Sequence, residues 1–231
     1  MKRPGLIPLR PVLRALLNSV ALPVLSAQVG LEEGRRVLAR AWDLYPAQLA
    51  AVDGTAKLGA GPALVMRLSA TVIALHKALI EAGTTHGEAV EIAGKVAWAV
   101  YRKMSRIPWL LSGIVSRDPE QRLDISTQIF RRFPFGPSAY EWKSRPAPAG
   151  VVAFDCLRCP VAEHFAKAGL QDLCVRTFCD LDFPLAADWS ATLERTGSIA
   201  AGAAVCDFRW QAKQIGQIPP FQPDVPASVT L

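Results

Sequence analysis

Apolar residues recur at helical spacing through the middle of the first half of the chain. Between residues 63 and 82 they stand three or four positions apart, at Leu64, Leu68, Val72, Leu75 and Leu79. That spacing places them on one face of an α-helix. Gly83 ends the segment, and Thr85 with Glu88 forms a capping-box pattern that starts another helix. The second helix has its apolar face at Ile92, Val96, Val100 and Met104. The two segments therefore predict an αα-hairpin.

The flanks of this hairpin also show helical patterns. Residues 30–50 predict a helix that Pro46 bends or restarts, and residues 53–62 read as a loop. Pro108 is expected to end the second hairpin helix or to begin a short successor. Residues 10–27 have an apolar middle after a basic start, which resembles a signal peptide, but polar residues interrupt it. We expect a helix docked on the body of the protein, with peripheral membrane contact as the alternative. Without a run of 18 apolar residues, no transmembrane segment is predicted.

The second half of the chain predicts strands with helices between them. Residues 117–150 are rich in Pro and aromatics and read as a connection with one strand near 140–145. Further strands are predicted at 151–156, 191–199 and 204–210, and helices at 160–173 and 183–189. Helices first and strands afterwards predict an α+β fold with an antiparallel sheet of about four strands. We expect a single domain over 1–213, with a helical half (1–116), a sheet-containing half (117–213) and an extended or disordered tail (214–231).

Charge and composition indicate which classes of partner this protein is expected to have. The net charge is +6, with 20 Lys and Arg against 11 Asp and Glu in residues 1–148, and 6 against 9 in residues 149–231. A basic front can suit nucleic acid. These bases are, however, spread along amphipathic segments without an accompanying aromatic motif, so no nucleic-acid partner is expected. A small-molecule substrate is expected instead, and a chain that is 51% hydrophobic leaves a homodimer interface open.

All five cysteines lie in the last third of the chain. An odd number does not suit a complete disulfide framework, so we expect reduced thiols and a cytoplasmic protein. No cofactor is required by any motif, although one metal site is an alternative. Its four thiolates would be Cys156, Cys159, Cys174 and Cys179, with His164 as a substitute ligand. The competing interpretation is that these are buried free cysteines in the core.

A second group of candidate residues joins thiols to acids and arginines. It comprises Cys179 and Asp182 in FCDLDF, Arg195, and Cys206, Asp207 and Arg209 in CDFRW. A thiol can act as a nucleophile when its thiolate is stabilised, here by Arg195 or Arg209, and either arginine suits a substrate carboxylate. Asp182 and Asp207 are candidate general bases. Alternation along a strand puts Cys206 and Phe208 on one face and Asp207 and Arg209 on the other. The alternative is a core role for the first pair and a surface ion pair for the second.

The C-terminal run resembles a known family. The residues that carry the resemblance are, in order, Cys156, Gly169-Leu170, Phe178-Cys179-x-x-Asp182, Arg195-Thr196-Gly197-Ser198-Ile199-Ala200-x-Gly202 and Cys206-Asp207-Phe208-Arg209-Trp210. In this order they are similar to the pattern of the L-2-amino-thiazoline-4-carboxylic acid hydrolase family. The resemblance covers about residues 150–210, and more weakly 63–104. It implies hydrolytic opening of a small cyclic isothiourea that carries a carboxylate. The implied roles are Cys206 or Cys179 as thiol, Asp182 or Asp207 as acid or base, and Arg195 or Arg209 on the carboxylate.

Two other functions stay open on the same scaffold. The last part of the run also resembles, over few residues, the vinyl-reductase-type small-molecule-binding domain, which like transport-particle subunits packs helices on an antiparallel sheet. That resemblance implies a binding module without catalysis, and lyase or isomerase chemistry is a further alternative. A binding module predicts a mostly apolar pocket without thiols or carboxylates, whereas a hydrolase predicts both along one cavity.

Overall fold

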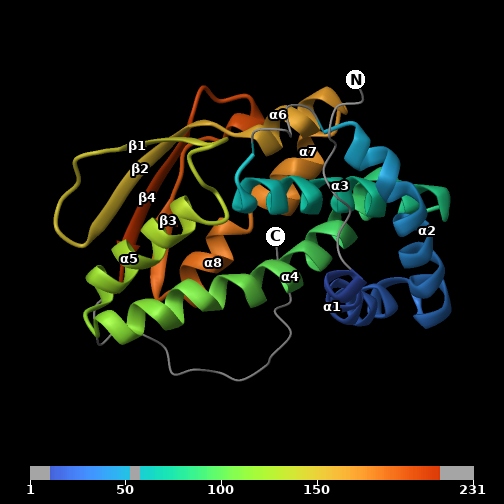
Figure 1. Cartoon of the computed structure of the whole chain (residues 1–231), viewed down its shortest axis with the longest axis horizontal. Helices are drawn as coiled ribbons and strands as arrows, with labels where there is room; N and C mark the ends of the chain where they lie inside the picture. The colour runs from blue at the N-terminus through green and yellow to red at the C-terminus, as the bar shows by residue number, and fades with distance from the viewer. Residues whose placement is uncertain (1–10, 53–57, 214–231) are drawn as a thin grey trace.

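The computed structural model describes residues 11–52 and 58–213, and Figure 1 shows the arrangement of its elements. The first part is helical and contains α1 (Pro11–Val29), α2 (Leu31–Ala50), α3 (Ala60–Glu81), α4 (His86–Val115) and α5 (Pro119–Arg132). The second part contains β1 (Glu141–Ser144), β2 (Val151–Arg158), α6 (Pro160–Lys167), α7 (Gln171–Cys174), the π-helix η2 (Val175–Cys179), α8 (Asp182–Asp188), β3 (Ala191–Glu194), the 3₁₀-helix η3 (Ile199–Ala201) and β4 (Cys206–Ala212). The predicted tail, residue 10 and half of the predicted 53–62 loop, residues 53–57, lie outside the described residues. The loop prediction is wrong for residues 60–62, because α3 already begins at Ala60.

The predicted hairpin is confirmed as α3 and α4. Thr85 caps α4 as expected, because its side chain accepts from the Glu88 amide while Glu88 accepts from the Thr85 amide. The expectation that Pro108 ends or restarts this helix is wrong, since α4 runs through Pro108 to Val115. Nearby side chains bond the backbone carbonyls around the proline: the Trp189 indole donates to Ser105 O at 3.0 Å, and Arg122 donates to Trp109 O at 3.0 Å. Pro108 has no N–H to donate to Met104 O, so the turn that contains it lacks one backbone hydrogen bond.

Helix α5 was not predicted, because the segment 117–150 reads as a connection with one strand. Its start nevertheless carries an N-terminal signal: Asp118 accepts from the Gln121 amide, and Pro119 occupies the first turn. Only three of its side chains are buried, Leu123, Ser126 and Thr127. Two of them are polar, which explains why the apolar periodicity is too weak to show the helix.

The N-terminal helices pack on the helical hairpin. The predicted helix over 10–27 is observed as α1, which buries Ala21 and Leu25 against the core. Pro46 lies inside α2, which continues past it to Ala50, so the helix does not restart there. Helix α3 is long and apolar enough to cross a membrane, but 61% of its most apolar window is buried inside the protein. This burial is what a core helix of a soluble protein shows.

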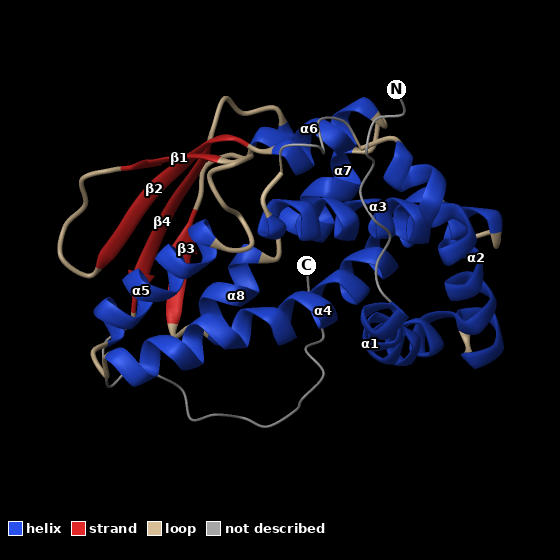
Figure 2. Cartoon of the chain, viewed as in Figure 1, coloured by secondary structure: helices blue, strands red, loops and turns tan. Residues whose placement is uncertain are grey.

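The four strands form one antiparallel sheet in the order β1-β2-β4-β3, which confirms the predicted α+β class (Figure 2). In its central pair, Cys156 lies opposite Cys206, Phe154 opposite Phe208 and Val152 opposite Trp210. These residues share one face of the sheet. Asp155 and Asp207 also lie opposite each other, on the second face. The alternation predicted for CDFRW is therefore confirmed.

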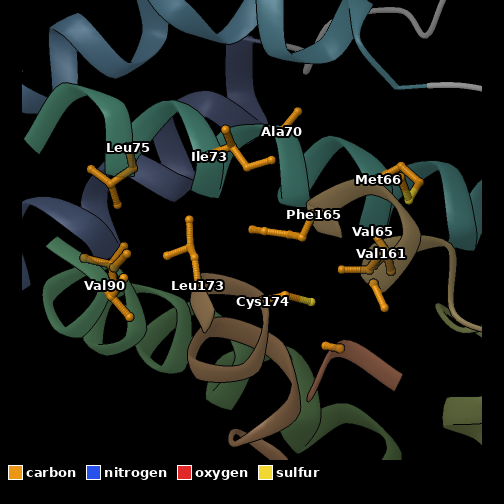
Figure 3. Close-up of a cluster of buried hydrophobic side chains, with 14 of the residues drawn as sticks. Val65, Met66, Ala70, Ile73, Leu75, Val90, Val161, Phe165, Leu173 and Cys174 are labelled. Carbon is orange, nitrogen blue, oxygen red and sulfur yellow. The ribbon is translucent and has the colours of Figure 1, made fainter. Parts of the chain in front are cut away.

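Helices cover the face of the sheet that carries Cys206. Helix α5 contacts β2 and β4, and the long helix α4 runs from the N-terminal helices to α5. The short helices α6 and α7 anchor the segment that follows β2, because Val161, Phe165 and Leu173 pack against α3 and α4 (Figure 3). One cluster of buried residues runs through both parts of the chain and surrounds the space between sheet and helices.

Candidate functional site

A cavity of about 100 Å³ lies between the inner face of the sheet and helices α4, α5, η2 and α8. A single buried water needs only about 10–15 Å³ of such space, so the cavity has room for a small ligand. Its walls are mainly aromatic. All five cysteines line it, together with one acid and two arginines: Cys156, Cys159, Cys174, Cys179, Cys206, Asp182, Arg131 and Arg195.

Cys206 lies at the start of β4 and is buried. Its sulfur accepts a hydrogen bond from the Ile199 amide at 3.2 Å. A hydrogen bond from Cys156, this amide and the charge of Arg195 lower the pKa of Cys206, against the raising effects of burial and Asp182. The Cys156 sulfur also lies 3.1 Å from Arg158 O, so its proton has two acceptors. Cys206 is thus the thiol of this cavity whose surroundings favour the thiolate.

Asp182 and Arg195 form a buried ion pair on the wall of the same cavity. Arg195 Nη1 donates to Asp182 Oδ2 at 2.9 Å and to Cys179 O at 3.0 Å, and only 5% of the Arg195 side chain is exposed. The Tyr101 hydroxyl donates to Asp182 Oδ1 at 3.2 Å. Burial raises the pKa of Asp182 to about 6, although Arg195 and Tyr101 act in the opposite direction. A carboxyl group with this pKa can both give and take a proton near neutral pH.

The π-helix η2 brings Cys179 and Asp182 to the cavity. In a π-helix an amide donates to the carbonyl five residues before it, and here the Asp180 amide donates to Val175 O at 2.8 Å. Such π-bulges are frequent at functional sites, because they turn the following side chains to a new direction. A hydrogen bond to Cys179 and burial raise the pKa of Cys174 well above its ordinary value, so Cys174 is a protonated thiol.

Asp207 does not line the cavity, in contrast to its predicted role as a general base. Its carboxylate accepts from the Thr196 amide at 3.0 Å, the Thr196 hydroxyl at 2.7 Å and the Gly197 amide at 3.0 Å. Burial raises the pKa of Asp207, but these hydrogen bonds outweigh it and lower the pKa overall. Asp207 therefore holds the turn that carries the Ile199 amide to Cys206.

Arg209 also faces away from the cavity. Its guanidinium donates to Asp155 Oδ1 at 3.0 Å, and Arg145 contacts the other oxygen of the same carboxylate at 2.5 Å. The sheet separates this group from Cys206, since odd and even residues of β4 lie on opposite faces. A substrate in the cavity therefore cannot reach Arg209.

The four cysteines of the predicted zinc set line the cavity, and one of them, Cys159, also has a local role. Cys159 caps α6 by accepting from the Ala162 amide at 3.5 Å, and burial raises its pKa to about 12. His164 is buried within α6. Among residues 11–52 and 58–213, no three His, Cys, Asp or Glu side chains are arranged to hold a metal ion.

A family model described as L-2-amino-thiazoline-4-carboxylic acid hydrolase matches residues 66–210. This match covers more than half of the chain. The chain belongs to the L-2-amino-thiazoline-4-carboxylic acid hydrolase family. No curated protein and no solved structure matches it.

The region matched by the hydrolase family contains every cavity-lining residue, from Tyr101 to Trp210. Among the residues that were not singled out from the sequence are Tyr101, Arg131 and Tyr140. Tyr101 lies beside the predicted apolar face of α4, and Arg131 lies on the helix that the sequence did not reveal. The backbone amide of Ile199 leaves no signal in a sequence at all.

A second cavity of about 90 Å³ adjoins the first, between α1, α2, α3 and α4. Its walls are almost entirely apolar. The two cavities share the side chains of Tyr101, Phe135 and Phe178. Aliphatic residues line much of the second cavity, whereas thiols and charged groups line the first.

Proposed function

We propose that the protein hydrolyses the C–N bond of a small cyclic isothiourea that carries a carboxylate, such as 2-amino-thiazoline-4-carboxylate. The proposal rests on one observation above all. Cys206, whose surroundings favour the thiolate, lines a single cavity with Asp182, whose pKa is about 6. The family to which the chain belongs supports the substrate class.

Cys206 is the proposed nucleophile. Its sulfur bonds to the ring carbon of the C=N group, and the electron pair of that double bond moves to the ring nitrogen. The carbon–nitrogen bond of the ring then breaks, and the nitrogen leaves as an amine after taking up two protons. Water next attacks the same carbon, Cys206 leaves as a thiolate, and the water returns two protons. The product is a carbamoyl-cysteine, and the sum of the steps is the addition of one water molecule.

Asp182 is the proposed acid and base for these proton transfers. Proton transfer by a positioned side chain accelerates such reactions by about 10²–10⁴-fold. Arg195 is a positioning residue, because its guanidinium is already bonded to Asp182 and Cys179 O. It fixes the carboxyl group and adds positive charge near Cys206.

Two features weigh against a non-catalytic binding module. Such a module predicts a pocket without thiols or carboxylates, whereas both occur in this cavity. In addition, the Ile199 amide and Arg195 stabilise a thiolate, which a binding pocket of apolar character does not require.

The test measures hydrolysis of 2-amino-thiazoline-4-carboxylate. Cys206→Ser should lower kcat by about 10³-fold or more, and Asp182→Asn by about 10²-fold or more. Cys159→Ser is the matched control, since it changes a protonated thiol of the same cavity and serine also caps helices. Mass spectrometry of the wild-type protein mixed with substrate should show the adduct on Cys206. Wild-type turnover in both Cys206→Ser and Asp182→Asn would show that these roles are wrong.

A further inference from the structure

The cavity contains three buried hydrogen-bond donors without a partner. They are Arg131 Nε, the Tyr140 hydroxyl and Trp210 Nε1, none of which has a hydrogen-bond partner among the described residues. Tyr140 and Trp210 are 4% and 3% exposed. An unsatisfied buried polar group costs about 1–3 kcal/mol, and native proteins contain few of them. Three in one cavity indicate that it holds water or a ligand that accepts hydrogen bonds from them.

The chemistry of these groups specifies the ligand. The guanidinium and the indole N–H can only donate, and the phenol can donate. A ligand that satisfies them must therefore offer acceptor atoms. Arg131 adds a positive charge: in the described part of the chain it forms no salt bridge, and its guanidinium lies 4.3 Å from the centroid of the Phe154 ring. An anionic acceptor is the best match, and a carboxylate fits the fork of an arginine.

The other arginines near the site are already neutralised by carboxylates. Arg195 is bonded to Asp182 inside the cavity, and Arg209 is bonded to Asp155 on the opposite face of the sheet. Of the two arginines that line the cavity, Arg131 alone forms no ion pair within the described residues, although the charge of Asp124 on the same helix acts on it. A carboxylate that bound Arg195 would compete with Asp182, whereas one that bound Arg131 would displace no bonded acid of the described residues.

The three donors belong to one continuous aromatic wall. The ring of Phe154 lies under Arg131 and stacks on Phe208 at 5.2 Å, and Phe208 stacks on Trp210 at 6.4 Å. On the other side, Trp142 contacts Phe154 at 5.6 Å and stacks on Tyr140 at 6.0 Å. Such a wall suits a flat, unsaturated ring.

We propose that Arg131 binds the carboxylate of the substrate, and that Tyr140, on one side of Phe154, donates a hydrogen bond to the same ligand. Trp210 lies at the other end of the wall and is not assigned to this ligand. The ring of the ligand then lies along the aromatic wall, between Arg131 and the thiol of Cys206. This inference deepens the proposed function and rests on it for the identity of the reacting ring. It replaces Arg195 and Arg209 as carboxylate-binding residues.

The experiment measures binding through the fluorescence of the cavity tryptophans, in a Cys206→Ser background that prevents turnover. The probes are 2-amino-thiazoline-4-carboxylate and its neutral 4-carboxamide. The acid should bind about 10–100-fold more tightly than the amide, as expected for a charge-assisted pair of hydrogen bonds. Arg131→Gln should remove this preference. Arg132→Gln is the matched control, because Arg132 is the exposed neighbour in the same last turn of α5 and should leave the preference intact.

Two more variants separate binding from folding. Arg131→Lys keeps the positive charge but not the two parallel donors of the guanidinium, so it should retain part of the preference for the acid over the amide. This variant keeps the test informative if Arg131→Gln does not fold. Tyr140→Phe should raise Tm without ligand, since it removes an unpaired buried hydroxyl, and should weaken binding of the acid by about 3–10-fold. A purely structural role for Tyr140 predicts a lower Tm instead.

The outcomes separate the two proposals. If the acid binds through Arg131 but the wild-type protein does not hydrolyse it, the carboxylate site stands and the proposed function fails. If hydrolysis occurs and neither its KM nor the binding preference depends on Arg131, the carboxylate site fails alone. Equal binding of acid and amide means that the donors serve only water, which also overturns the inference. Absence of binding by either probe overturns both proposals.

Discussion

The buried carboxyl group of Asp182 predicts a dependence of stability on pH that is opposite to that of most ion-paired acids. Burial raises its pKa from 3.8 to about 6, whereas Arg195 and Tyr101 lower it without outweighing the burial. Below pH 3.8 both folded and unfolded chains hold the proton, and the contribution of this group to stability is fully present. As the pH rises towards about 6, the unfolded chain releases the proton before the folded one does. The free energy of unfolding therefore falls across this window.

The size of the effect follows from the difference between the two pKa values. One unit corresponds to 1.36 kcal/mol, so a change from 3.8 to about 6 lowers the free energy of unfolding by about 3 kcal/mol between pH 3.5 and 7. Asp182→Asn removes this titration. It also leaves the guanidinium of Arg195 without its partner, which lowers stability by about 3–5 kcal/mol. That loss is independent of the Asp182 proton and cancels when two pH values are compared.

The assay is urea denaturation of the wild-type protein and Asp182→Asn at several pH values between 3.5 and 7. Other acids titrate in both proteins, so the quantity of interest is the difference between the two stabilities at each pH. We expect the advantage of the wild-type protein to shrink by about 3 kcal/mol as the pH rises. An advantage that grows with pH would show that Arg195 outweighs burial and that the pKa of Asp182 is lowered. Such a carboxyl group would be a poor proton donor near neutral pH.

Two further predictions test the turn and the metal alternative. Gly197→Ala should lower the free energy of unfolding by about 1–3 kcal/mol, because its new Cβ would lie 2.8 Å from the Cβ of Ala203. Gly87→Ala is the control in the same urea titration, because a Cβ at Gly87 would have no atom within 4 Å. Equal effects of the two substitutions would contradict the steric argument. Dialysis against a chelator should leave Tm unchanged, since no described group of His, Cys, Asp and Glu is arranged for a metal ion; a large drop in Tm, or about one equivalent of zinc in protein purified without added metal, would favour the cysteine site instead.

The sequence determines the parts of this protein that depend on local periodicity. The spacing of apolar residues predicts α1 to α4, and strand alternation places Cys206 and Phe208 on one face and Asp207 on the other. The cap at Thr85 is also local, since both partners lie within one turn. These features follow from neighbouring residues, which is why a single sequence reveals them.

The tertiary structure alone decides what each polar residue of the site does. Asp182 and Cys206 are 24 residues apart along the chain, and they line one cavity only after the elements have packed. The role of Asp207 as the holder of a turn depends on backbone amides 10 and 11 residues away, and the partner of Cys206 is itself an amide of Ile199. Backbone donors have no identity in a sequence, so neither contact could be predicted.

The roles of Arg131 and Pro108 were also not predicted, because they too depend on partners that the sequence does not show. The charge of Arg131 is distinctive because the arginines with acidic partners, Arg195 and Arg209, are committed elsewhere, and a sequence does not show which charges are paired. Helix α4 continues through Pro108, and the indole of Trp189, 84 residues after Ser105, donates to the carbonyl of Ser105 in the turn before the proline. Local patterns thus determine the elements, whereas the pairing of charges and hydrogen bonds, which forms the site, exists only after the elements pack.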